Sequence, residues 1–125
     1  MTNVLLLEPD RISAKCIAEE LEKLSFEVYK ASGAETAIAQ ADKQKPDLVI
    51  CELSLPGHSG SEFIYEFRTY SDWNDIPLII YSSIKATEKV VKSKDWKLLN
   101  ISEVIYKPDF SLNKLVKLAE NLTQK

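Results

Sequence analysis

The chain has 125 residues, of which 45% are hydrophobic and 28% are charged, and its formal net charge is −3. Its length fits one domain, because single domains commonly hold about 100–150 residues. The acidic balance argues against a nucleic-acid partner, which needs a basic surface. No apolar run reaches the roughly 18 residues of a membrane-spanning helix, and no secretory signal precedes the first apolar segment. We therefore expect a single soluble domain over residues 1–125, located in the cytoplasm.

The first third of the chain alternates between strand-like and helix-like patterns. A continuous apolar run at 4–7 is typical of a strand buried on both faces. We expect a helix at 11–24, a strand at 26–29 and a second helix at 34–41, which begins after the start signal Ser32-Gly33. The first helix is expected to bury a stripe of apolar residues at helical spacing. This stripe consists of Ile12, Ala14, Ile17, Leu21 and Leu24.

The middle of the chain continues the alternation. Pro46 ends the second helix, and the apolar segment at 47–51 predicts another fully buried strand. A loop rich in glycine, proline and serine follows at 54–61. The apolar residues at 63–67 then lie on one face of a predicted helix, and the run at 77–81 predicts the fourth strand.

The last third supplies a helix that begins near Ala86, a short strand at 104–106 and an amphipathic helix at 112–122. Five strands thus alternate with five helices. Apolar strands joined by helices favour a parallel sheet that helices cover on both faces. Right-handed crossovers then favour a single doubly wound sheet of the flavodoxin-like α/β class, with strand order 2-1-3-4-5.

Polar residues gather where the predicted strands end. Ligands of doubly wound sheets bind outside the carboxyl ends of the strands. Carboxylates, hydroxyls and an ammonium group at one edge suit phosphoryl chemistry or a hard metal ion. Any one of these residues could equally be a solvated loop residue, so the set indicates a site more strongly than its members do. The set consists of Glu8, Asp10, Glu52, Ser82, Ser83 and Lys107.

The sequence resembles the receiver domains of response regulators, the modules that accept phosphate from histidine kinases. The resemblance covers essentially the whole chain and implies a CheY-like protein of bacterial two-component or phosphorelay signalling. It further implies a monomer or weak dimer, with no enzyme activity of its own, that binds a histidine kinase or an effector but neither nucleic acid nor membrane. The segments that carry it are 4–10, 46–57, 59–60, 76–83 and 107–108.

Three positions match functional residues of the family directly. Glu8 corresponds to the first member of the acidic pair, and Ser82 corresponds to the hydroxyl that moves toward the phosphoryl group. Ser83 follows at the same strand end. Lys107 corresponds to the lysine that pairs with the phosphorylated side chain.

Two other positions depart from the family pattern. Glu52 stands where the family has the aspartate that becomes phosphorylated, and Pro9 stands where it has an acid that ligates Mg²⁺. The backbone carbonyl of Ser54 would be the third protein ligand of that metal. Asp10 falls one position late, so it could replace the lost ligand only if the loop shifted.

These departures predict a pseudo-receiver that is not phosphorylated at the usual site. Glutamate carries its carboxylate about 1.5 Å farther than aspartate, and a misplacement of about 1 Å can cost roughly a hundredfold in rate. Loss of a carboxylate ligand weakens Mg²⁺ binding further, so we expect no cofactor. We expect Glu52 to pair with Lys107 and the module to act by protein–protein interaction. The alternative is a phosphate-accepting regulator that binds Mg²⁺ weakly through Glu8, Asp10 and the Ser54 carbonyl.

The resemblance also implies a surface for partners. Family members present their fourth helix, fifth strand and fifth helix, with an aromatic switch residue three positions before the lysine. Val104 stands at that position here, and Tyr106 lies on the same face of the strand. Trp96 and Leu118 are further candidates. Leu118 lies outside the apolar stripe of its helix and is therefore expected to be exposed.

Two other functions with similar patterns fit less well. A flavin-binding flavodoxin needs an amide-rich phosphate loop after the first strand, and the acidic segment Glu8-Pro9-Asp10 would repel phosphate. A serine hydrolase is suggested by the segment at 57–61, but Ser61 stands where the nucleophile elbow needs glycine. Cys16 and Cys51 are expected to be small buried apolar residues rather than redox groups.

Overall fold

The computed structural model describes residues 2–57, 59–84, 99–109 and 111–124. Five parallel strands form one sheet in the order β2-β1-β3-β4-β5, so the predicted strand order is confirmed. Residues 4–7 of β1 and all of β3 are continuous apolar segments, as expected for strands buried on both faces. The strand bounds are Thr2–Leu7 (β1), Phe26–Ala31 (β2), Leu48–Cys51 (β3), Leu78–Ser82 (β4) and Glu103–Tyr106 (β5).

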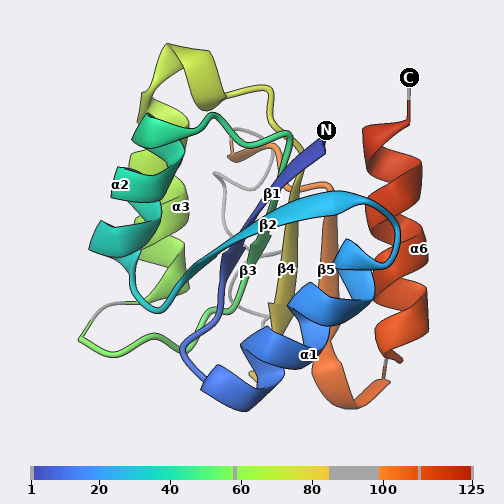
Figure 1. Ribbon diagram of the computed structural model, residues 1–125. Coiled ribbons are helices and arrows are strands. Elements are labelled where there is room, and N and C mark those ends of the chain that lie inside the picture. Colours follow the sequence, from blue (N-terminus) through green and yellow to red (C-terminus); the bar gives the residue numbers. More distant parts are fainter. Residues whose placement is uncertain (1, 58, 85–98, 110, 125) are drawn as a thin grey trace.

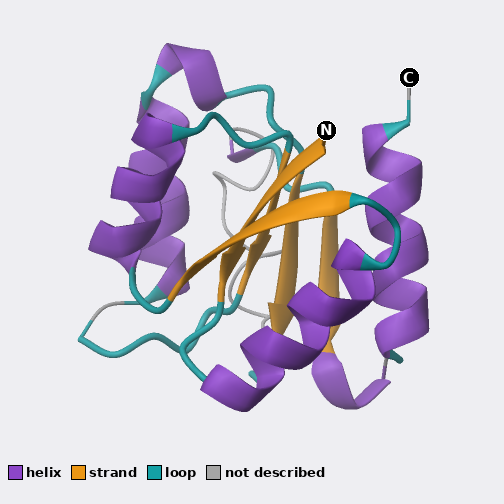
Figure 2. Cartoon of the chain, in the orientation of Figure 1, coloured by secondary structure: helices purple, strands orange, loops and turns teal. Residues whose placement is uncertain are grey.

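Helices cover both faces of the sheet, as Figures 1 and 2 show: α2 and α3 pack on one face, and α1 and α6 pack on the other. Four of the five predicted helices fall in the described residues, and the helix predicted from about residue 86 lies outside them. None of the described helices is long and apolar enough to cross a bilayer. The helix bounds are Arg11–Glu22 (α1), Ala34–Lys43 (α2), Gly60–Thr69 (α3) and Leu112–Thr123 (α6), with short 3-10 turns at Ser71–Trp73 and Lys107–Asp109.

The core has two halves, one on each face of the sheet. Successive residues of a strand point to opposite faces, so Leu5 and Leu7 of β1 join the half under α2 and α3. Val4 and Leu6 join the half under α1 and α6. All four are at most 1% exposed. This burial holds the ends of β1 and β3 in fixed positions at the sheet edge.

The apolar stripe predicted for the first helix is partly wrong. Ala14, Ile17 and Leu21 are buried, but Ile12 is 75% exposed. Residues of a helix advance by about 100° each, so Ile12 lies about 200° from Ala14 and faces away from the sheet. The helix also ends at Glu22, before Leu24, which is 43% exposed in the turn that leads to β2.

The two cysteines differ in their surroundings. Cys51 is buried as predicted, and burial raises the pKa of its thiol. The expectation for Cys16 is wrong, because this residue is exposed on α1. It lies two positions from Ala14 and therefore on the opposite side of the helix from the buried stripe.

Candidate functional site

Five of the predicted site residues meet at the carboxyl edge of the sheet, and one of them, Ser83, follows β4 and donates to Glu52. Glu8 follows β1, Glu52 follows β3, Ser82 ends β4 and Lys107 follows β5. Glu8, Glu52 and Ser82 are 5%, 4% and 0% exposed. Charged groups are costly to bury unless they are paired or hydrogen-bonded, so the partners of these side chains define what the site can do.

One carboxylate oxygen of Glu52, Oε2, accepts three hydrogen bonds. The backbone N–H of Leu53 donates at 2.6 Å and that of Ser54 at 3.1 Å. The hydroxyl of Ser82 is the third donor. The same hydroxyl oxygen accepts the backbone N–H of Ile84 at 3.1 Å, which fixes it at the end of β4.

The other oxygen, Oε1, has three further contacts. The backbone N–H and the hydroxyl of Ser83 both donate to it at 3.0 Å. The ammonium of Lys107 lies 3.2 Å away. The Glu52 carboxylate is therefore enclosed by backbone amides, two hydroxyls and one cation, and the predicted pair with Lys107 is present.

Lys107 joins both buried acids. Its ammonium contacts Oε1 of Glu8 as well as Glu52, and it lies 5.5 Å from the centre of the Tyr81 ring. Burial alone would lower the pKa of Lys107, but the two carboxylates outweigh it and the pKa is raised. The lysine is thus held in its charged form between two anions.

The hydrogen bonds of Glu52 decide its protonation. Burial opposes ionisation and would raise the pKa of the carboxyl, but the donors from Ser82, Ser83 and Ser54, together with the charge of Lys107, lower it below the ordinary value. Hydrogen bonds to the charged form favour that form. Glu52 is therefore a carboxylate at neutral pH.

Gly60 allows α3 to lie close to the segment that follows β3. The sequence pattern did not predict this role. A Cβ atom at Gly60 would lie 2.5 Å from the carbonyl oxygen of Glu52 and 2.6 Å from Cα of Leu53. The N–H of Gly60 donates to the carbonyl of Leu53 at 2.8 Å. Only glycine permits this approach. The sequence feature that could have indicated this role is the pair Ser59-Gly60, which lies just before an apolar helical stripe. Ser59 caps α3.

The side chains present do not fit the Mg²⁺ site that the resemblance implies. Asp10 is exposed, and its carboxylate caps α1 by accepting the N–H of Ser13 at 3.2 Å and its hydroxyl at 2.7 Å. These hydrogen bonds lower the pKa of Asp10. Glu8 accepts the N–H of Asp10 at 3.1 Å and pairs with Lys107, and Pro9 offers no side-chain ligand.

The third candidate ligand belongs to a residue that already contacts Glu52, because the backbone N–H of Ser54 donates to its carboxylate. Ser54 is exposed and forms an isolated antiparallel bridge with Ser59. Among the residues that the structure describes, no three acidic, histidine or cysteine side chains are grouped so that they could hold a metal ion.

The predicted partner surface is only partly available for comparison. Trp96 lies outside the described residues. Val104 is half-buried and packs against the core under α2 and α3, and Tyr106 is half-buried on β5. The prediction that Leu118 is exposed is wrong, because it is half-buried against the core under α1 and α6. The buried stripe of α6 is wide enough to include it as a flanking residue.

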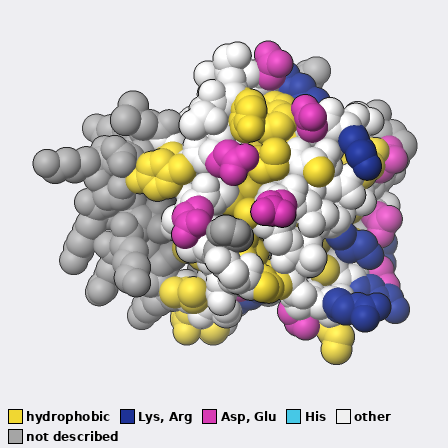
Figure 3. All heavy atoms as spheres, turned by 90° about the vertical axis from the view of Figure 1, so that its left-hand side faces the viewer, with side chains coloured by type: hydrophobic (Ala, Val, Ile, Leu, Met, Phe, Trp, Pro, Cys, Tyr) yellow, Lys and Arg dark blue, Asp and Glu magenta, His cyan; other side chains and the backbone are white. Residues whose placement is uncertain are grey.

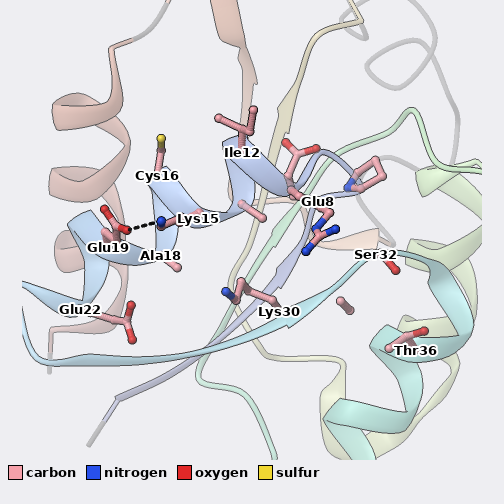
Figure 4. Close-up of a pocket in the computed structure, with 14 residues that line it drawn as sticks. Glu8, Ile12, Lys15, Cys16, Ala18, Glu19, Glu22, Lys30, Ser32 and Thr36 are labelled. Carbon is pink, nitrogen blue, oxygen red and sulfur yellow. Dashed lines mark ion pairs between the residues drawn. The ribbon is translucent and has the colours of Figure 1, made fainter.

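A groove that the sequence did not predict lies beside α1, next to the site. Its volume is about 960 Å³. Figure 4 shows Ile12 and Cys16 from α1, and Lys30 and Ser32 from β2 and the turn after it, around this groove. Lys15 pairs with Glu19 at 3.9 Å. Pro9 and Glu8 also line the groove, so it reaches the edge of the buried cluster.

Comparisons with known proteins agree with this architecture. A family model of the response regulator receiver domain matches residues 4–120. The KDP operon transcriptional regulatory protein KdpE of Escherichia coli K12 is 34% identical over 83 residues, which are 66% of this chain and 36% of KdpE. The phosphate regulon regulatory protein PhoB of the same organism is 27% identical over 113 residues, which are 90% of this chain and 48% of PhoB. The chain thus spans half or less of the length of these two relatives.

Solved structures share the fold at low sequence identity. The chemotaxis protein CheY4 of Vibrio cholerae has a TM-score of 0.85 and 23% identity, with 98% of each chain covered. The non-phosphorylated HemR receiver domain of Leptospira biflexa has a TM-score of 0.86 and 22% identity, and the match covers 100% of this chain and 96% of that one. Together with the family model, the strand order and the position of the acid–hydroxyl–lysine cluster, these matches show that the chain belongs to the response regulator receiver domain family.

Proposed function

We infer that this chain is a receiver-type module of two-component signalling that acts by binding a protein partner, without phosphorylation at residue 52 and without catalysis of its own. The observation that carries this inference is the set of donors on Glu52. Each of its two carboxylate oxygens contacts three donors, from Leu53, Ser54, Ser82, Ser83 and Lys107.

These contacts oppose phosphoryl transfer to Glu52. A carboxylate has about four lone-pair sites on its two oxygens, and six donors already point at them. An attacking oxygen would first have to give up hydrogen bonds in a buried place, where an unmet donor costs about 1–3 kcal/mol. The resting carboxylate is thus stabilised as a hydrogen-bond acceptor and weakened as a nucleophile.

The same contacts support a fixed signalling state. Amides, hydroxyls and an ammonium are also the groups that hold a phosphoryl group, and here they close on the carboxylate of Glu52. The carboxylate brings one negative charge, whereas a phosphoryl group brings about 1.5 to 2. We infer that Glu52 holds Ser82 and Lys107 in place of a phosphoryl group, so that the module stays in one conformation.

The groove beside α1 supports the interaction role. An apolar side chain that is 75% exposed, Ile12, lies at its rim within one helical turn of Asp10. Asp10 donates its N–H to Glu8, which pairs with Lys107. A partner seated in the groove would therefore contact the helix whose first turn is joined to the buried cluster.

Intact mass spectrometry after incubation with acetyl phosphate and Mg²⁺ tests the function. We expect no phosphoryl adduct on the wild type. The double variant Pro9→Asp/Glu52→Asp should gain one adduct, because it shortens the acceptor and restores an acid beside Glu8. The Pro9→Asp single variant is the matched control, since it restores the acid but keeps the long acceptor.

A stoichiometric adduct on Glu52 of the wild type would contradict the proposal. It would favour the phosphate-accepting regulator, in which Asp10 leaves its capping position to bind Mg²⁺. NMR titration with Mg²⁺ separates the two, because only that regulator requires saturable shifts at Glu8 and Asp10.

A further inference from the structure

The face formed by α2 and α3 carries two hollows along the line where the helices meet. One hollow of about 320 Å³ lies between the first halves of the helices, and one of about 350 Å³ lies at the end of α2 beside the turn Ser71–Trp73. Figure 3 shows this face, with acidic side chains around a strip of hydrophobic atoms. The face lies on the other side of the sheet from α1 (Figure 1), the helix that lines the groove described above.

Acidic residues outnumber basic residues in the lining of the two hollows. Five carboxylates and one ammonium line the two hollows. They carry a net charge of −4, whereas the whole chain carries −3 by the same count of side chains. The acids are Glu35, Glu62 and Glu66 in the first hollow and Asp42 and Asp72 in the second, which also holds Lys45.

Two acids of the first hollow form no ion pair with a described cation. The ion pairs recorded among the described residues lie on α1 or at the carboxyl edge of the sheet. Neither Glu35 nor Glu66 forms an ion pair with a described residue. Like charges at Glu35 and Glu66 attract a partner of the opposite sign and repel nucleic acid.

The hollows also offer apolar contact. Ala34, Ile38 and Phe63 form the apolar part of the first hollow, between the acidic side chains. Tyr70 is 43% exposed at the second hollow, and the centroids of the Tyr70 and Trp73 rings are 4.6 Å apart. An apolar centre with a charged rim is the anatomy of a protein-binding surface.

We propose that this face docks a basic amphipathic helix of a partner protein. Glu62 and Glu66 are one turn apart on α3, and Glu35 lines the same hollow from α2. The matching ligand has lysines or arginines four residues apart, next to an aliphatic side chain that enters the hollow. The line of contact is about 15 Å long, the length of ten helical residues, so about three turns of a partner helix fill it.

The test uses the full chain and a synthetic alanine-based helical peptide with lysines four residues apart beside a stripe of leucines. In a titration followed by ¹H–¹⁵N NMR, we expect saturable shifts confined to α2, α3 and the turn Ser71–Trp73. The variant Glu35→Lys/Glu66→Lys should raise the dissociation constant about tenfold, because each reversal removes one attraction and adds one repulsion. A peptide with the lysines replaced by glutamate should not bind.

The matched control is Glu22→Lys/Glu103→Lys, which makes the same change in net charge at exposed positions on α1 and β5. It should bind the peptide within about twofold of the wild type, since only charges within about 10 Å act strongly at 0.1 M salt. Equal weakening by the control, shifts spread over all acidic positions, or no binding would each overturn the proposal. None of these outcomes bears on phosphorylation of Glu52, so the two proposals fail independently.

Discussion

Two partly buried cations, Lys107 and Arg68, lie at opposite ends of the sheet and are satisfied in different ways. Lys107 follows β5 at the carboxyl edge, where it meets the carboxylates of Glu8 and Glu52. Arg68 lies near the end of α3 and contacts the segments that lead into β4 and β5. The first cation belongs to an ionic cluster, and the second is held by backbone dipoles.

The guanidinium of Arg68 donates to four backbone carbonyls. Its Nε donates to Leu99 at 2.7 Å and its Nη1 to Trp73 at 2.6 Å. Its Nη2 donates to Ile76 at 2.7 Å and to Asn100 at 3.1 Å. A planar fork of donors suits this arrangement, which ties the turn before β4 to the turn before β5.

The difference shows which buried charge is structural and which belongs to a site. Burial lowers the pKa of Arg68, and the charge of Asp75 does not fully offset it. The pKa of Lys107 is raised because two carboxylates face it. Among the described residues of this cluster, two anions face one cation, a balance that stability alone does not require.

The largest effect is expected for Lys107→Met. Removing the cation leaves Glu8 and Glu52 buried without a counter-charge, which should cost about 3–5 kcal/mol in the free energy of unfolding. Urea unfolding measures the loss. Lys117→Met, at an exposed position of α6, is the control and should change stability by less than about 0.5 kcal/mol. A loss at Lys107 as small as the control would mean that the acids gain little from the ion pairs.

Arg68→Met should lower the free energy of unfolding by about 2–4 kcal/mol, somewhat less than Lys107→Met. Hydrogen bonds from a charged donor contribute about 1.5–3 kcal/mol each, but solvent reaches part of this site and reduces the total. Arg68→Lys should recover only a small part of this, since a single ammonium cannot span four carbonyls. Hydrogen exchange should rise at the amides that begin β4 and β5. If the lysine variant is as stable as the wild type, charge rather than fork geometry accounts for the role of Arg68.

The third effect depends on pH. The pKa of Glu52 is lowered in the folded chain, so its stabilisation is present above its ordinary pKa of 4.5 and is lost as the pH falls through the folded value. Glu52→Gln should be about 2 kcal/mol less stable at neutral pH, because an amide satisfies fewer of the donors. The gap to the wild type should begin to close near pH 4.5 and should narrow further as the pH falls through the lowered pKa of the folded chain. A gap that stays constant in acid would show that the carboxylate charge is not what stabilises the site.

Sequence patterns predicted the ionic cluster around Lys107 but not the hydrogen bonds of Arg68 to backbone carbonyls. Glu8, Glu52 and Lys107 each follow an apolar strand, and the strand order alone brings them to one edge. Their geometry could not be predicted, because the donors include backbone N–H groups of Leu53 and Ser54 whose direction depends on the turn after β3. Pattern reasoning therefore located the site without giving its hydrogen bonds.

The role of Arg68 could not be predicted from the sequence. An arginine near the end of a helix is expected to be a solvated residue. Its four acceptors are backbone carbonyls, and no sequence motif indicates such acceptors. The carbonyls of Leu99 and Asn100 come from a segment more than thirty residues away. The exposure of Ile12, by contrast, follows from its angle on the helix relative to Ala14 and could have been predicted.

Ile12→Ser is expected to change the free energy of unfolding least and serves as the reference for the other three variants. Ile12 is 75% exposed, and serine and isoleucine have similar helix propensities. The free energy of unfolding should therefore change by less than about 0.5 kcal/mol, measured in the same urea series. Because Asp10 keeps its cap on Ser13, the link from α1 through Glu8 to Lys107 stays intact. A loss above about 1 kcal/mol would mean that Ile12 is packed rather than free for a partner, and the proposed role of the α1 groove would fail.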